Sequence, residues 1–149
     1  MAPATVRQQG AYQVLTGHAR ILVQEDEEDD NWLEAFQRPA KYEWITGTTQ
    51  CDDDGLTIVQ AIKDGNALAV CDGSLKDDFG AAAWTIEGMD QSHRILGNCG
   101  STGPPQVQSS YRAELMGILG ILYTVTSLVK WYKIEQGKIR IGCDNESAV

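Results

Sequence analysis

The sequence lacks several features that would place it in common protein classes. Its 4 cysteines form no C-x-x-C pair and have no histidine at zinc-ligand spacing, so neither a disulfide framework nor a zinc site is indicated. No apolar segment follows Met1, as a signal peptide would require. The longest uncharged apolar stretch, Leu115–Val129, has 15 residues, fewer than the roughly 20 that cross a bilayer. We expect an intracellular protein, cytoplasmic or nuclear, without a membrane partner.

Basic residues are also scarce. The chain has 12 Lys+Arg against 21 Asp+Glu, a net charge of -9. Residues 1–65 carry 12 acidic and 5 basic residues, and residues 66–149 carry 9 and 7, so the two segments contribute about -7 and -2. An acidic chain repels a polyanion, so any nucleic-acid partner must be held by local basic groups and by metal ions.

Residues 1–65 are predicted to form an acidic N-terminal extension or linker. The segments 12–15 and 20–23 could pair as a hairpin, and residues 56–62 could form a short helix. The run of six acids at 25–30 is typical of a solvated loop or linker, with an interaction tail as the alternative. The aromatic residues that follow could pack against the next domain. We place the domain boundary near residue 65.

Residues 66–149 are predicted to form a mixed α/β sheet with one long helix. Strands are expected at 66–72, 79–87 and 94–102, joined by short turns that suit an antiparallel meander. A helix over 109–132 should follow, and then a fourth strand at 138–144. Because a helical crossover connects the first and fourth strands, these two should be parallel.

Three carboxylates occupy unusually apolar elements. Asp72 and Asp144 each follow a short apolar strand, and Glu114 lies in the apolar helix. On a helical wheel Glu114 shares one stripe with core-type residues, which are Tyr111, Ile118, Ile121 and Val125. This stripe should face the sheet. Period-2 alternation should direct Cys71 and Cys143 away from the neighbouring aspartates, most simply as core thiols.

A bound cation would explain such an arrangement. Carboxylates are costly to desolvate, and three of them close together repel one another unless cations neutralise them. Hard oxygen ligands suit Mg²⁺ or Mn²⁺, and two such ions can clamp the attacking water and the leaving oxygen of a phosphodiester. The pattern therefore predicts a metal-dependent nuclease core with Asp72, Glu114 and Asp144 as ligands.

The same residues resemble the ribonuclease H family, in the form attached to retroelement reverse transcriptases. Cys71-Asp72-Gly73-Ser74 is similar to the family's first-strand signature, 110–115 to its motif around the catalytic glutamate, and Cys143-Asp144-Asn145 to its fourth-strand aspartate. The resemblance covers residues 66–149. It implies that Asp72, Glu114 and Asp144 bind two Mg²⁺ or Mn²⁺ ions and catalyse hydrolysis of the RNA strand of an RNA–DNA hybrid.

The resemblance further implies contacts with the hybrid and with a reverse-transcriptase domain of the same polyprotein. The residues it assigns to the substrate are Gly73, Ser74, Ser109, Ser110, Tyr111 and Asn145. The family often has amides at the positions of Ser110 and Tyr111. Its fourth carboxylate, a fifth strand and several helices follow the fourth strand, whereas this sequence ends at Val149. We therefore expect a C-terminally truncated domain with weak or undetectable activity.

Two alternatives belong to other classes. Transposases and integrases use a related fold with acidic triads, but their glutamate usually follows the second aspartate, whereas Glu114 precedes Asp144. The other alternative is a catalytically inactive remnant that acts as a nucleic-acid-binding or protein-interaction module. Convergence of the three carboxylates within metal-bridging distance distinguishes the enzyme from the remnant.

Overall fold

The computed structural model describes residues 5–9, 12–16 and 31–143. The chain divides into two compact units, residues 1–30 and 31–149, and each is described by itself. In the first unit, strands β1 (Thr5–Gln9) and β2 (Tyr12–Thr16) form an antiparallel hairpin. The segment 12–15 thus forms a hairpin as predicted, but its partner is β1, which precedes it in the sequence, and not the segment 20–23. The expected strand at 20–23, the acidic run at 25–30, Asp144 and Asn145 lie outside the described residues.

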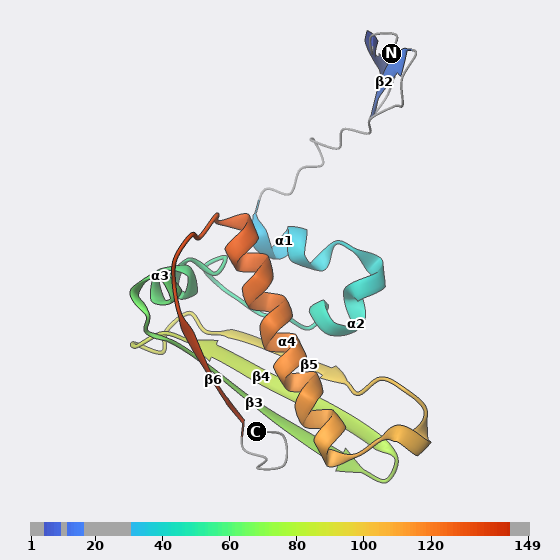
Figure 1. Cartoon of the computed structure of the whole chain (residues 1–149), viewed down its shortest axis with the longest axis vertical. Coiled ribbons are helices and arrows are strands. Elements are labelled where there is room, and N and C mark those ends of the chain that lie inside the picture. The colour runs from blue at the N-terminus through green and yellow to red at the C-terminus, as the bar shows by residue number, and fades with distance from the viewer. Residues whose placement is uncertain (1–4, 10–11, 17–30, 144–149) are drawn as a thin grey trace. The chain divides into compact units, whose positions relative to one another are not determined.

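The second unit is built on a mixed four-stranded sheet (Figure 1). Its strands are β3 (Ala67–Lys76), β4 (Phe79–Glu87), β5 (Ile95–Gly100) and β6 (Ile139–Cys143), in the spatial order β5-β4-β3-β6. β3 and β4 pair antiparallel, as do β4 and β5, whereas β6 is parallel to β3. The predicted α/β class, antiparallel meander and parallel fourth strand are confirmed.

Helix α4 (Ser110–Trp131) packs against the centre of this sheet. It begins where the Ser109 hydroxyl accepts a hydrogen bond from Arg112 N, a standard N-cap. Gly117 and Gly120 face the sheet, because a Cβ on Gly117 would lie 2.7 Å from Cys71 Cβ and one on Gly120 would lie 2.4 Å from the Trp84 ring. The glycines therefore allow a close approach of helix and sheet. By length and composition alone α4 could also cross a membrane, as many buried core helices could.

The buried stripe of α4 differs from the predicted one. It follows mainly small residues, namely Ala113, Glu114, Gly117, Gly120, Ile121, Thr124 and Leu128. Glu114 and Ile121 belong to it as expected, but the Tyr111 side chain is 47% exposed. Because the helix lies close to the sheet, mainly small side chains fit in the contact, and the bulkier apolar side chains of α4 lie on either side of it.

Residues 31–65 belong to the same compact unit as the sheet, so the expected boundary near residue 65 falls inside it. This segment forms α1 (Trp32–Gln37), the short helix η2 (Ala40–Tyr42), α2 (Glu43–Thr46) and α3 (Leu56–Asp64). A further short helix, η3 (Pro105–Val107), precedes α4. The Asp54 carboxylate joins three parts of the unit, accepting hydrogen bonds from Trp32 N, Leu33 N and the Tyr132 hydroxyl.

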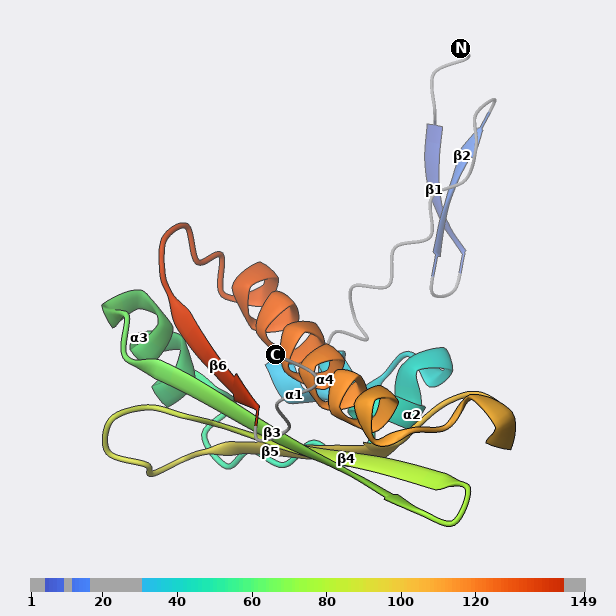
Figure 2. The same cartoon turned by 60° about the horizontal axis from the view of Figure 1, so that its bottom comes forward.

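The two faces of the sheet have different environments. Figure 2 shows α1, α2 and α4 on the same side of the sheet, where Ala67, Ala69 and Cys71 of β3 are buried. On the opposite face Asp72 and Ser74 are exposed. The alternation that the sequence predicted for Cys71 and Asp72 is thus confirmed.

Candidate metal and nucleic-acid site

Glu114 is the most unusual side chain of the unit. It is only 2% exposed, yet it carries a carboxylate into the contact between α4 and β3. Its Oε1 accepts a hydrogen bond of 2.9 Å from Gly73 N, and its Oε2 accepts one of 2.9 Å from Cys143 Sγ. Gly73 directly follows Asp72 in the sequence, and Cys143 directly precedes Asp144. Both bonds to Glu114 therefore come from residues adjacent to the predicted metal-binding aspartates.

Gly73 is what lets α4 come close enough for these bonds. A Cβ at this position would lie 2.6 Å from Ala113 C and 2.6 Å from Glu114 N, which are backbone atoms of the helix. No other residue type fits without displacing the helix, because such separations are far inside van der Waals contact. The glycine of the predicted Asp-Gly-Ser motif therefore has a structural role that fixes the position of Glu114.

Asp72 lies within β3, one residue past the last residue of this strand that pairs with β6. The pairing of β3 with β6 ends at Cys71 and Cys143, so in the described part of the chain residues 72–76 pair with β4 alone. The Asp72 carboxylate is exposed and has no hydrogen-bond or ion-pair partner among the described residues. With Gly73, Ser74 and residues of β4 and β5 it lines a shallow groove of about 340 Å³. Asp72 is therefore open to solvent, on the face of β3 opposite to the buried Cys71.

The predicted substrate residues divide into two groups. Gly73 and Ser74 lie beside Asp72 in the groove. Ser109, Ser110 and Tyr111 lie at the start of α4, where the Ser109 hydroxyl caps the helix and Ser110 and Tyr111 are exposed. None of these three lines the groove. Asn145 and Asp144 lie outside the described residues, so the convergence of all three carboxylates stays a prediction.

The donor atoms of Asp72 and Glu114 suit a hard divalent cation. Among the described residues, the Asp72 carboxylate has no partner and each oxygen of Glu114 accepts one hydrogen bond. A carboxylate oxygen has lone pairs for a second interaction. Mg²⁺ and Mn²⁺ bind such oxygens. The residues present therefore fit the predicted cation, with two of its three expected ligands described.

Two thiols accompany Glu114, although alternation in the sequence predicted Cys71 and Cys143 as core thiols without a role in the site. Cys71 and Cys143 are opposite each other in the parallel pairing of β3 and β6. Burial, followed by the proximity of Cys143, Glu114 and Asp72, raises the pKa of Cys71 to about 12. The sequence places each cysteine next to a predicted metal-binding aspartate, but their shared contact depends on the strand register.

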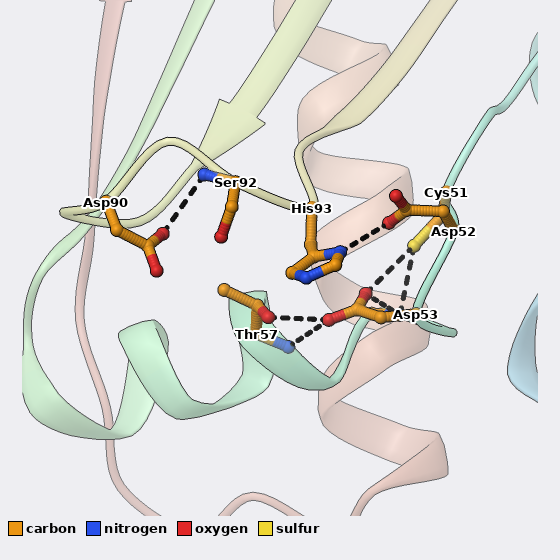
Figure 3. Close-up of polar contacts among 8 residues, drawn as sticks. Cys51, Asp52, Asp53, Thr57, Asp90, Ser92 and His93 are labelled. Atoms are coloured by element: carbon orange, nitrogen blue, oxygen red, sulfur yellow. Dashed lines mark hydrogen bonds and ion pairs between the residues drawn. The ribbon is translucent and has the colours of Figure 1, made fainter.

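A second polar cluster lies where the loop before α3 meets the turn before β5 (Figure 3). His93 Nδ1 lies 2.8 Å from Asp52 Oδ1, and this hydrogen bond raises the pKa of His93. The adjacent Asp53 accepts hydrogen bonds from Gly55 N and from both the N–H and the hydroxyl of Thr57. Asp53 therefore closes the turn and starts α3, a structural role that explains its position.

Comparisons with protein-family models, with curated proteins and with solved structures return no match to this chain.

Proposed function

We propose that the chain carries a ribonuclease H-like nuclease core that hydrolyses the RNA strand of RNA–DNA hybrids, with two Mg²⁺ or Mn²⁺ ions as cofactors. The observation that carries this proposal is the pair of hydrogen bonds to Glu114 from Gly73 and Cys143. They bring a buried helical carboxylate to β3 at the residue that follows Asp72, and to the last residue of β6, which precedes Asp144 in the sequence. The mixed sheet with its helical crossover further supports the proposal.

In this proposal Asp72, Glu114 and Asp144 hold the cations. When bound, the two ions activate a water molecule and stabilise charge on the leaving oxygen. Gly73 positions Glu114 in two ways. Its N–H orients the Glu114 carboxylate by a hydrogen bond, and its lack of a side chain allows α4 to pack close to β3. Ser74 lines the groove beside Asp72, where a phosphodiester backbone could lie. Ser109, Ser110, Tyr111 and Asn145 are the proposed contacts with the minor groove of the hybrid.

Cation binding provides the first test. Mg²⁺ or Mn²⁺ should raise the melting temperature of the chain, because bound cations relieve repulsion among the carboxylates. Asp72→Asn should remove most of this rise in melting temperature, because it removes a proposed cation ligand. The variant should still fold, because Asp72 is exposed. Asp78→Asn, an exposed change in the turn after β3, is the matched control. A rise of equal size in all three proteins would place the ions elsewhere.

Catalysis provides the second test. A hybrid labelled on either strand is incubated with residues 1–149, and with a chain carrying whatever follows Val149 in its source reading frame. We expect weak or undetectable cleavage by residues 1–149. The extended chain should cleave the RNA strand in a reaction that depends on Mg²⁺ or Mn²⁺, and its rate should fall by at least about 100-fold in Asp72→Asn and Glu114→Gln. Cation binding without hydrolysis by either chain would instead support the inactive remnant. Cleavage that both variants retain would disprove the assignment of the site.

A protein-interaction module is a second candidate, favoured by the outer side of α4. Several large apolar side chains of this helix are exposed, namely Leu115, Leu119, Leu122 and Trp131. Part of this surface forms a groove of about 640 Å³ that also includes Tyr123 and Lys130. Exposed apolar patches of this kind often mark partner-binding surfaces. Leu122→Glu should abolish partner binding while leaving the cation-induced rise in melting temperature unchanged.

A further inference from the structure

The contact between β3, β6 and α4 contains a second set of metal-ligand atoms. The Sγ atoms of Cys71 and Cys143 and a carboxylate oxygen of Glu114 all lie within 4.8 Å of one another. Cys71 and Glu114 are buried and Cys143 is half-buried. The backbone fixes this grouping, because Cys71 and Cys143 are paired in the sheet and Gly117 of α4 packs directly against Cys71.

Among the described residues, no ion pair balances the charge of the Glu114 carboxylate. In the described part of the chain no Lys, Arg or His forms an ion pair with the Glu114 carboxylate, although this side chain is only 2% exposed. Its two partners are the neutral N–H of Gly73 and the thiol of Cys143. A buried carboxylate without a cation is costly, and the usual remedies are an ion pair or a metal. A bound cation at this position would offset that cost.

The donor atoms decide which cation suits this position. Two thiol sulfurs and one carboxylate oxygen make a soft to borderline ligand set, which Mg²⁺ binds poorly and Zn²⁺ binds well. We propose that Cys71, Cys143 and Glu114 form a binding site for Zn²⁺ or a similar thiophilic cation, on the helix side of β3. The site goes beyond the proposed nuclease, since its existence does not require catalysis.

The spacing of the donors is compatible with zinc after small side-chain adjustments. Two sulfurs at about 2.3 Å from a tetrahedral zinc ion lie roughly 3.8 Å apart, so the observed spacing requires closure by about 1 Å at most. Binding replaces the thiol protons, so that Zn²⁺ enters and two protons leave for solvent. The hydrogen bond from Cys143 Sγ to Glu114 is then replaced by metal–ligand bonds. A water molecule can fill the fourth position, reached from the half-buried side of Cys143.

Sharing of Glu114 has a regulatory consequence, which rests on the proposed nuclease function. A zinc ion on the thiol side withdraws the Glu114 carboxylate from the hard cations that it would hold together with Asp72. Zn²⁺ should therefore inhibit hybrid cleavage at concentrations far below that of Mg²⁺. Replacement of Cys143 by serine should relieve this inhibition.

Cobalt spectroscopy of residues 1–149 tests the site independently of catalysis. Co²⁺ is added to the reduced protein under a phosphine reductant, and thiolate-to-cobalt charge transfer is followed in the near ultraviolet. We expect a stoichiometric band that Zn²⁺ abolishes by competition and that excess Mg²⁺ leaves intact. Cys143→Ser should weaken cobalt affinity by more than the roughly 10–100-fold that the loss of a supporting residue costs.

Matched cysteine variants complete the design. Cys99→Ser removes a buried thiol of β5 outside the cluster and should leave the band unchanged. Cys71→Ala tests the second sulfur, and circular dichroism establishes that each variant is folded. Glu114→Gln retains both sulfurs and should keep a weaker band. Absence of a band in the folded parent chain, or a band that survives in both Cys71→Ala and Cys143→Ser, would overturn the proposal.

Discussion

Gly73→Ala tests the contact on which the whole site depends. The added methyl would lie 2.6 Å from Ala113 C, 2.6 Å from Glu114 N and 2.9 Å from Ala113 O. All three are backbone atoms in the first turns of α4, so no side chain can rotate away to relieve the overlap. The helix must instead move off β3, and that movement stretches the hydrogen bond between Gly73 N and Glu114.

The magnitude follows from two opposing terms. Alanine in place of glycine in a strand should gain about 0.5–1 kcal/mol from reduced backbone entropy. Overpacking typically costs about 1–3 kcal/mol, and a clash with backbone belongs at the upper end of that range. We expect Gly73→Ala to lower the free energy of unfolding by about 2 kcal/mol. With an m value of about 1.5 kcal/mol/M, the urea midpoint should fall by more than about 1 M.

Gly142→Ala is the matched control for this prediction. Gly142 is also a strand glycine, but among the described residues its added Cβ would meet Val70 Cγ1 alone, at 3.9 Å, an ordinary contact. This variant should be unchanged or slightly more stable in urea unfolding followed by tryptophan fluorescence. If Gly73→Ala matches Gly142→Ala in stability, the close contact of α4 with β3 is not what positions Glu114.

Two further predictions concern the loop that joins α1, α3 and α4. Asp54→Ala removes the acceptor for Trp32 N, Leu33 N and the Tyr132 hydroxyl, and should lower the free energy of unfolding by about 3 kcal/mol. Asp64→Ala, which loses one exposed bond, should change it by less than about 0.5 kcal/mol in the same urea series; equal losses would contradict the structural role of Asp54. The second prediction is that Asp52→Asn lowers the pKa of His93, as measured by NMR titration, because Asp52 holds the protonated ring. Since the folded-state pKa of His93 is raised, the stabilisation from this pair is present below about pH 6.5 and is lost as pH rises through the raised value; a His93 pKa that is unchanged in Asp52→Asn would refute this account.

Much of the sheet could be predicted because its signals are local. The expected second strand has the observed bounds, Phe79–Glu87. The other strands and helices expected in the second unit begin and end within a few residues of their predicted bounds. The largest difference is the extension of β3 beyond Asp72 to Lys76, where Lys76 pairs with Phe79 across a two-residue turn. Asp77 in this turn has a positive φ of 58°, a conformation that aspartate tolerates better than most residues.

The position of residues 31–65 could not be predicted, because it depends on contacts distant in the sequence. Trp32 is fully buried and its indole N–H donates to Ser127 of α4, 95 residues away. The acidic composition favoured a solvated extension. In the structure, however, the carboxylates of Asp53 and Asp54 accept hydrogen bonds from backbone N–H groups of the same unit. Composition reports the average solvation of a segment and does not reveal such pairings.

The candidate site could be predicted only in part, because some of its features follow from local periodicity and others depend on distant contacts. Alternation placed Asp72 opposite to Cys71, and helical periodicity turned Glu114 towards the sheet, as the structure has them. The hydrogen bond between Cys143 and Glu114 depends on the register of a parallel pair and on the depth at which α4 packs. Gly73 and Gly117 were the available signals of that depth, since each occupies a point of close contact.

The two proposed metal sites share only Glu114, and this makes them separable. Asp72→Asn should remove the melting response to Mg²⁺ and leave the cobalt–thiolate band, because Asp72 lies on the other face of β3 from the thiols. Cys143→Ser should weaken cobalt binding and keep the melting response to Mg²⁺, because a serine hydroxyl can still donate a hydrogen bond to Glu114. Glu114→Gln should weaken both responses, since the amide keeps an acceptor but loses the charge. A thiophilic cation generally outcompetes Mg²⁺ at a site with sulfur ligands. Which ion occupies this contact is therefore decided by the supply of zinc as much as by the protein.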